Sequence, residues 1–172
     1  TCWNTAGAVI ACPGTGQDGD LQTGLILAYV DNGDGTITDS NTGLMWEKLD
    51  DNNASGIHDW SDLYTWANAF AVKIAALNAG GGFAGYTDWR LPNRKQLDSI
   101  VNLGNANPAV SPAFNTGCTP GCAVTSCSCT ALDKTSWSSS SYAGSPSFAW
   151  MVSFGRGEDL VHPKENSLSV RA

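Results

Sequence analysis

Residues 29–46 read YVDNGDGTITDSNTGLMW, and this stretch decides the fold class. It contains three short β-prone runs, which are separated by two clusters of Asn, Asp and Gly at 31–35 and 39–43. These residue types supply the positive φ angles that tight hairpin turns require. The stretch therefore predicts a three-stranded antiparallel meander.

The hydrophobic period changes beyond Asp59. Apolar residues then recur at helical spacing, and they are Leu63, Trp66, Phe70, Ile74 and Leu77. This pattern predicts a helix that Asp59 or Ser61 caps and that the glycines at 80–82 end. A second, shorter helix is expected after Pro92, with Asn93 as N-cap and Gln96 completing a capping box.

The last third of the chain returns to strand patterns. Residues 148–154 alternate between large and small side chains, which is typical of a half-buried antiparallel strand. Weaker strands are predicted at 135–140, 160–162 and 168–171. Since strands precede and follow a helical centre, the order predicts an α+β fold rather than an alternating parallel sheet.

Six cysteines occur in two groups, Cys2 and Cys12 near the start, and Cys118, Cys122, Cys127 and Cys129 within the long stretch 104–134. An even count favours disulfides and an oxidising compartment. A bridge between the first two would tie down the opening residues, and the four others allow three pairings. The alternative is a zinc site in the second group, although its CxxxC and CxC spacings differ from paired CxxC knuckles.

Composition limits the class of protein. The chain has 172 residues, which suits one domain over 1–172 with a loop-like N-terminal arm at 1–24. Its net charge is -7 and only 15% of its residues are charged, without a basic stripe that would bind nucleic acid. No run approaches the roughly 20 apolar residues of a membrane span. Because the sequence opens at Thr1 without Met, we expect that a leader was removed or that it is an excised piece.

Several segments together resemble a known family. They are Gly16–Asp20, Asp31–Asp39, Thr42–Trp46, Gly85–Asn93 with Gln96 and Leu97, Trp137–Ser140, and Val170 with Arg171. In this order they are similar to the Lcl C-terminal domain family, which is named from a bacterial collagen-like adhesin. The resemblance covers nearly the whole chain.

The resemblance implies a C-type-lectin-like fold, with two helices flanking a small antiparallel sheet and a disulfide-stapled long loop. It also implies an exported bacterial protein at the cell surface, without known catalytic residues. The named adhesin binds sulfated polysaccharides and is thought to trimerise, so a homo-oligomer is expected. The acidic balance of this chain argues against binding sulfated polymers. The Glu-Pro-Asn or Gln-Pro-Asp and Trp-Asn-Asp signatures of calcium-dependent lectins are missing from the sequence.

One calcium site is conceivable in the meander. Asp31, Asp34 and Asp39 offer carboxylate oxygens, which calcium prefers, but their spacing is not that of an EF-hand. The alternative is that Asn, Asp and Gly only shape the turns, and it is the better hypothesis. Apart from calcium, no cofactor is expected.

A second set of residues is a candidate ligand rim. One member is Tyr142, in the serine-rich segment 138–147. The others form the densest charged stretch in the second half of the chain, and they are Arg156, Glu158, Asp159, His162 and Lys164. The alternative is that these are ordinary solvated loop residues. Asp88, Arg90 and Arg94 flank the second helix, where a buried ion pair locking helix to sheet is the simplest interpretation. Most tryptophans are expected in the core, including Trp46, Trp66, Trp89, Trp137 and Trp150.

Catalysis is not expected. His58 and His162 lie in no metal or triad spacing. Formylglycine-generating oxidases share the implied fold class and use a cysteine pair with copper, but the context of Cys127 and Cys129 is that of a disulfide cluster. The sequence thus predicts a non-catalytic extracellular binding or adhesion module with a carbohydrate or a surface protein as partner. The alternative is a structural subunit of an extracellular filament, pilus or sheath.

Overall fold

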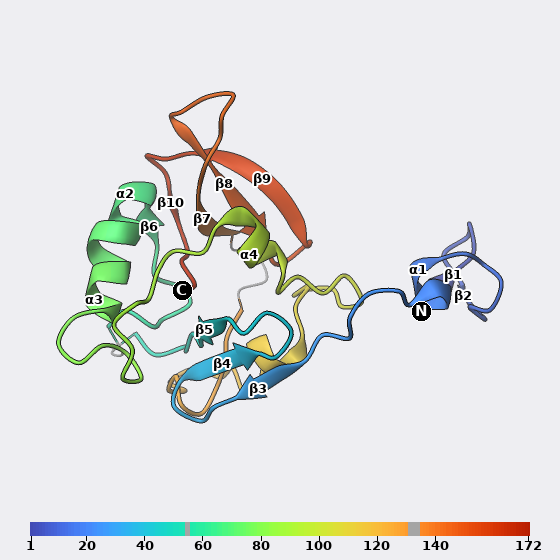
Figure 1. Ribbon diagram of the computed structural model, residues 1–172, viewed down its shortest axis with the longest axis horizontal. Coiled ribbons are helices and arrows are strands. Elements are labelled where there is room, and N and C mark those ends of the chain that lie inside the picture. The colour runs from blue at the N-terminus through green and yellow to red at the C-terminus, as the bar shows by residue number, and fades with distance from the viewer. Residues whose placement is uncertain (54–55, 131–134) are drawn as a thin grey trace.

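The computed structural model describes residues 1–53, 56–130 and 135–172, and its mixture of helices and small antiparallel sheets confirms the α+β class. Four sheets occur in these residues. They are β1 (Cys2–Trp3) with β2 (Val9–Ile10), β3 (Tyr29–Asp31) with β4 (Thr36–Asp39) and β5 (Met45–Glu47), β6 (Tyr64–Thr65) with β10 (Ser167–Leu168), and β7 (Thr135–Ser141) with β8 (Phe148–Ser153) and β9 (Glu158–Pro163). Figure 1 shows the last two sheets above the β3–β5 sheet.

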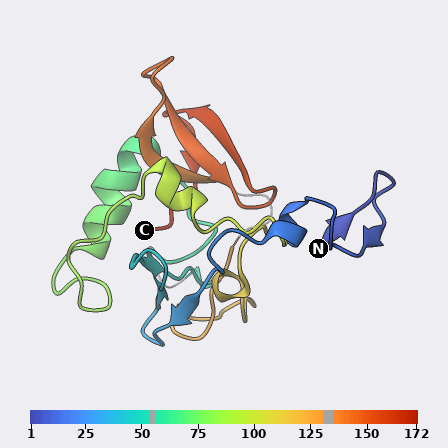
Figure 2. The same ribbon diagram turned by 45° about the vertical axis from the view of Figure 1, so that its right-hand side comes forward.

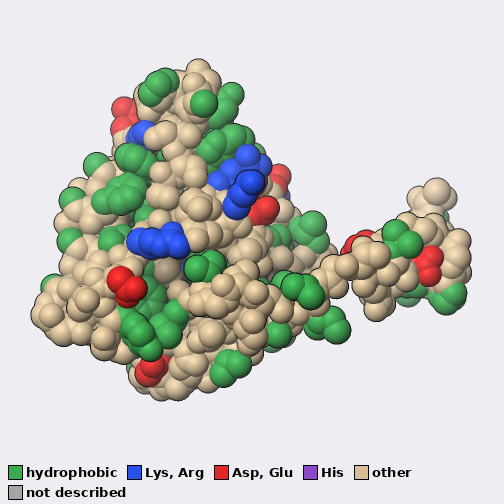
Figure 3. Space-filling model, viewed as in Figure 1, with side chains coloured by type: hydrophobic (Ala, Val, Ile, Leu, Met, Phe, Trp, Pro, Cys, Tyr) green, Lys and Arg blue, Asp and Glu red, His purple; other side chains and the backbone are tan. Residues whose placement is uncertain are grey.

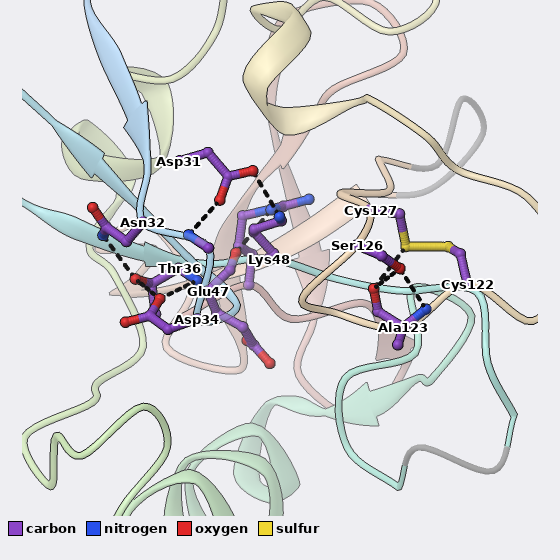
Figure 4. A network of polar contacts seen from close by, with 12 residues as sticks. Asp31, Asn32, Asp34, Thr36, Glu47, Lys48, Cys122, Ala123, Ser126 and Cys127 are labelled. Carbon is purple, nitrogen blue, oxygen red and sulfur yellow. Dashed lines mark hydrogen bonds and ion pairs between the residues drawn. A yellow bond between two sulfur atoms is a disulfide. The ribbon is translucent and has the colours of Figure 1, made fainter.

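The predicted meander is confirmed as β3, β4 and β5. Ile37 and Trp46 face each other across β4 and β5, and both are buried in the core. In the β3–β4 turn, the Asp31 carboxylate accepts a hydrogen bond from the Gly33 amide at 2.9 Å, and the Asp34 carboxylate accepts one from the Thr36 hydroxyl at 2.6 Å (Figure 4). Aspartate side chains therefore shape this hairpin, as they do in Asx turns generally.

The long helix starts later than predicted. It consists of α2 (Trp66–Asn68), a π-helical stretch η1 (Ala69–Ile74) and α3 (Ala75–Leu77), and Thr65 caps its start by accepting a hydrogen bond from the Asn68 amide. The prediction of Asp59 or Ser61 as N-cap was wrong, because the Asp59 carboxylate instead accepts a hydrogen bond from the Ser61 amide in a preceding turn.

The buried side of this helix also differs from the prediction. Ala69, Lys73 and Leu77 are buried, whereas Leu63 and Phe70 are exposed. A π-helix bonds residue i to i+5 rather than i+4, so the wider turn rotates the face that a regular 3.6-residue period assigns to the core.

The second predicted helix is confirmed as α4 (Arg94–Asp98). Both hydrogen bonds of the capping box are present, since the Asn93 side chain accepts from the Gln96 amide and the Gln96 side chain accepts from the Asn93 amide. Leu97 and Ile100 bring its apolar side into the same core cluster as Val152. A short 3-10 helix, η2 (Pro112–Phe114), lies in the long loop and adds Phe114 to this cluster.

The β7–β9 sheet carries most of the remaining core. The predicted strands at 135–140, 148–154 and 160–162 are confirmed with small changes at their ends. The prediction for 168–171 was mostly wrong, because β10 ends at Leu168 and Ser169 forms only a single bridge with Ser136. Trp137, Ala149 and Met151 pack with Ala69 of η1 in a second core cluster.

The tryptophans divide into two groups. Trp46, Trp89 and Trp137 are buried as predicted. Trp66 and Trp150 are only half-buried, so the prediction of core positions for these two was wrong. Each is covered by a cation instead, with Lys164 Nζ and Arg94 Cζ each 4.0 Å from a ring centroid. Such stacking keeps the charge in water while it shields the ring.

All six cysteines form disulfides, as predicted, and the pairings are Cys2–Cys12, Cys118–Cys129 and Cys122–Cys127. The sulfurs of Cys122, Cys127 and Cys129 lie close together, but they belong to disulfides and are not thiolates, so the zinc alternative is not supported. Figure 4 shows the Cys122–Cys127 bridge beside Ala123 and Ser126.

Residues 1–24 extend away from the rest of the chain (Figures 1 and 2). Between turns and irregular segments, this arm contains β1, β2 and a one-turn helix, α1 (Asp18–Leu21). The Cys2–Cys12 bridge links its first strand to the turn that follows β2. Within the described residues, no hydrogen bond or ion pair joins the arm to the body, by which we mean the described residues from 29 onward. None of the described helices has the length and apolar character needed to cross a bilayer.

Candidate functional site

A groove of about 360 Å³ opens on the body between β5 and the segment that leads into α4. It is lined by Gly43, Leu44, Met45, Trp46, Tyr86, Asp88, Trp89, Arg90, Pro92, Gln96 and Ala172. Figure 3 shows this side of the molecule, where hydrophobic side chains lie beside basic and acidic ones. We call this feature the groove below.

The upper wall of the groove is held in place by Asn78 at the end of the long helix. The Asn78 side chain both donates to the Trp89 carbonyl and accepts from the Trp89 amide, each at 2.8 Å. The Trp89 indole donates to the Phe83 carbonyl at 3.0 Å. These bonds fix the loop at both ends, and such preorganisation lowers the entropy cost of binding.

Gly82 is needed for the same loop. Its φ is +75°, and a Cβ on it would lie 1.9 Å from the Tyr86 carbonyl oxygen. Only glycine combines this conformation with so close an approach. The Phe83–Tyr86 turn that follows therefore depends on Gly82.

Polar groups stand on the rim of the groove. Asp88 and Arg90 are exposed, and Tyr86 is 45% exposed. Arg90 Nη1 donates to Gln96 Oε1 at 2.6 Å, which holds the guanidinium against the start of α4. The rim thus offers an aromatic face, a carboxylate and a guanidinium beside an apolar floor, the mixture that orients small ligands in shallow sites.

The predicted ion pair at this helix forms with a different partner. Arg94 on α4 pairs with Asp159 on β9, while Asp88 and Arg90 stay on the groove rim. The Arg94 pair does join the second helix to the sheet, but it is not the buried pair that was predicted, because the Arg94 side chain is 42% exposed. The prediction was wrong for Asp88 and Arg90.

Beneath the groove lies a buried ionic cluster centred on Glu47. One of its carboxylate oxygens contacts Lys73 Nζ at 2.5 Å and His58 Nδ1 at 2.8 Å, and the other accepts the Ala172 amide at 3.2 Å. Burial alone would raise the pKa of Glu47, but attraction to Lys73 and the hydrogen bond from His58 outweigh it and lower the pKa. Glu47 therefore stays ionised.

Arg171 closes the cluster from the other side. Its guanidinium donates to the Glu47 carbonyl at 2.9 Å and to the Cys129 carbonyl at 2.6 Å. Burial lowers the pKa of Arg171 to about 10 despite the attraction of Glu47. These bonds join β5, the disulfide loop and the last residues of the chain, so the cluster supports the groove from below.

The structure does not bring the predicted ligand rim together. Arg156 and Glu158 form an exposed pair at the start of β9, with a nitrogen–oxygen distance of 3.5 Å. His162 and Lys164 lie at the other end of that strand. Asp159 forms an ion pair with Arg94 of α4. These residues therefore line both ends of one strand rather than one pocket.

Tyr142 lies in the β7–β8 turn and is half-buried, with its ring packed edge-on against Trp150 at 5.5 Å. The Tyr86 and Trp3 side chains are more exposed than Tyr142. Nearby, Lys164 Nζ donates to the Ser141 hydroxyl at 2.7 Å. The side chains at this end of the sheet therefore contact one another.

The three candidate calcium ligands lie in two different turns. Asp31 and Asp34 belong to the β3–β4 turn, and Asp31 pairs with Lys48 Nζ at 2.8 Å. Asp39 shapes the next turn, where its carboxylate accepts bonds from the Asn41 amide and the Thr42 hydroxyl. The carboxylates therefore do not converge, and calcium binding stays a prediction.

The sequence did not predict the groove, although the two segments that form its walls are both recognisable in it. The segments 42–46 and 85–93 carried the family resemblance, but their distance along the chain gave no sign that they meet. The available signal was that two charged residues, Asp88 and Arg90, flank Trp89, a pattern that also fits a structural ion pair.

Comparison with protein families matches the Lcl C-terminal domain over residues 35–172. The chain belongs to the Lcl C-terminal domain family. The predicted resemblance is thus confirmed, while its segment 16–20 and the first residues of its segment 31–39 lie outside the match. Comparisons with curated proteins and with solved structures give no match. Both walls of the groove fall inside the Lcl C-terminal domain, and the arm falls outside it.

Proposed function

We propose that this chain is a non-catalytic, extracellular binding module and that the groove is its ligand site. The observation that carries the proposal is the convergence of two distant family segments on one preorganised groove with an exposed Tyr86, Asp88 and Arg90. Membership of the family suggests a surface-associated domain. Three disulfides support an oxidising, extracellular setting.

The lining of the groove favours binding over catalysis. The described residues that line it include no Ser, Thr, Cys, His or Lys, and Asp88 is the single carboxylate side chain among them. Nucleophilic catalysis needs a nucleophile with an adjacent base, and glycoside hydrolysis commonly needs two carboxylates. The chemistry on the rim is instead suited to hydrogen bonding with a polar ligand across an aromatic face.

A carbohydrate is the ligand class that we propose for the groove. An exposed aromatic ring next to a carboxylate and a guanidinium can stack on a sugar ring while bonding its hydroxyls. A neutral or cationic glycan suits the net charge of -7 better than a sulfated one. A C-type-lectin-like scaffold remains part of this proposal.

The test is a glycan array probed with the purified chain and with three variants. We expect binding to at least one neutral glycan, and at least tenfold weaker binding for Tyr86→Ala and Asp88→Asn, since one lost hydrogen bond or stacking contact is worth about 1.4 kcal/mol. Arg156→Ala, at an exposed position outside the groove, is the matched control. If only the control loses binding, the ligand site lies on β9 and not in the groove. If the chain binds no glycan on the array, the proposal of a carbohydrate ligand is rejected.

A second function, a structural subunit of an extracellular filament, pilus or sheath, is favoured by the extended arm with its exposed Trp3 and Val9. Few charges need desolvation when such a surface assembles. Electron micrographs of the purified protein separate the two functions, because only the second predicts ordered polymers.

A further inference from the structure

The segment 25–30, which joins the arm to β4 through β3, has an unusual surface. Its sequence is LILAYV, and Leu25, Ile26 and Val30 are 80%, 88% and 52% exposed. Residues 21–30 contain no charged side chain. Half of the large hydrophobic residues exposed in the described part of the chain lie within the first 27 residues. An apolar surface of this kind marks an interaction site.

The same segment is the open edge of a sheet. The strand order is β3, β4, β5, so β3 has a neighbour on one side only. The Ser40 amide donates to the Ala28 carbonyl and the Asn32 amide to the Thr36 carbonyl, which places residues 28, 30 and 32 in the bonded positions of the ladder. By the alternation of antiparallel pairing, the backbone groups of Leu27, Tyr29 and Asp31 point away from β4.

The edge lacks the protection that exposed edges usually have. Natural edge strands carry Lys, Pro, bulges or inward charges that prevent pairing with another chain. The edge strand β9 of the other sheet follows this rule with Glu158, Asp159 and Pro163. Nothing comparable interrupts 25–30, and the charge of Asp31 is already compensated by Lys48 at 2.8 Å.

We propose that this edge pairs with the same edge of a second copy of the chain and forms a symmetric antiparallel dimer. The twofold axis lies at Tyr29, so that Leu27 of one copy bonds with Asp31 of the other and Ala28 lies opposite Val30. The two β3–β5 sheets then become one continuous sheet. This surface is separate from the groove, and β3 precedes the family match that begins at residue 35.

A second copy fits the edge better than an unrelated strand does. The edge is self-complementary, because antiparallel pairing about Tyr29 sets Ala28 against Val30 and Tyr29 against Tyr29. Asp31 lies opposite the uncharged Leu27, so no like charges face each other across the pair. A strand pair alone buries less than the roughly 1,200 Å² of a stable interface, so the exposed apolar residues of the arm, Trp3, Val9 and Leu21, supply the additional area against the partner. We expect a reversible dimer that dissociates on dilution.

The experiment uses sedimentation velocity of the full chain from about 1 to 100 µM. Two double variants form a matched pair, since residues 28 and 30 of opposite copies face each other. Ala28→Lys with Val30→Lys sets Lys against Lys and should weaken the dimer at least tenfold. Ala28→Lys with Val30→Glu sets Lys against Glu and should keep the dimer. Leu160→Lys, at an exposed position on β9, should leave it unchanged.

Three results would overturn the proposal: a wild-type chain that stays monomeric or forms trimers over this range, a Lys/Lys variant that still dimerises, or a Lys/Glu variant that fails as the Lys/Lys variant does. Far-ultraviolet circular dichroism confirms that each variant is folded. Because Tyr86 and Asp88 are untouched, glycan binding by the monomeric variant tests the groove independently of the dimer.

Discussion

Glu47 gathers Lys73, His58 and Ala172 around one buried carboxylate. Removing such a charge from water is costly unless every partner is in place. The arrangement gives the floor of the groove a fixed position, because the same carboxylate binds the long helix and the last residue of the chain. The contribution of this cluster to stability depends on all of its hydrogen bonds and ion pairs being formed together, rather than on any single bond.

Lys73→Met tests this cluster. The change leaves Glu47 buried without its strongest cationic partner, and we expect the free energy of unfolding to fall by about 3 kcal/mol. Urea denaturation at neutral pH measures it. Lys95→Met, on the exposed side of α4, is the control and should change stability by less than about 0.5 kcal/mol. Equal losses for the two variants would contradict a structural role for the cluster.

The cluster was beyond sequence reasoning for a definite reason. A lysine in a helix is normally placed on the solvated side. Lys73 lies four residues from both Ala69 and Leu77, on the buried side of the long helix, where its ammonium group contacts Glu47. The periodicity of apolar residues predicted the existence of the helix but assumed a regular 3.6-residue turn.

At the scale of elements, the sequence predicted secondary structure best where turn and capping residues determine the backbone conformation. The Asn, Asp and Gly clusters gave the meander, and the Asn93–Gln96 capping box gave α4 at its observed start. Both depend on contacts within a few residues. The groove depends instead on Trp89 reaching Asn78, a long-range pairing that no local pattern contains.

Gly82→Ala tests the loop that forms the upper wall of the groove. The added Cβ would meet the Tyr86 carbonyl at 1.9 Å in a positive-φ conformation, so the loop must shift. We expect a loss of more than about 1 kcal/mol in stability and a moved Trp89 indole resonance in nuclear magnetic resonance spectra. Gly81→Ala is the matched control, because nothing lies within 4 Å of its new Cβ. An unchanged indole resonance in Gly82→Ala would show that the loop does not depend on this glycine.

At the scale of the whole molecule, the arm and the body each have their own disulfides. The sequence predicted six paired cysteines but left three pairings open for the last four, because pairing follows from the path of the loop and not from spacing. The observed Cys118–Cys129 bridge sits next to Arg171, whose guanidinium donates to the Cys129 carbonyl. The body's disulfides are thus linked to its ionic cluster, while Cys2–Cys12 stands apart.

Two disulfide deletions of nearly equal loop length separate these roles. Cys118 and Cys129 are 11 residues apart, and Cys2 and Cys12 are 10 apart, so the two bridges restrict the unfolded chain similarly. Replacing Cys118 and Cys129 by Ala should lower the stability of the body by about 3 kcal/mol. Replacing Cys2 and Cys12 by Ala should leave the body's unfolding transition in place, because no described hydrogen bond joins arm and body. Thermal unfolding followed by calorimetry at low protein concentration measures both, and equal shifts of the main transition would mean that arm and body unfold as one cooperative unit.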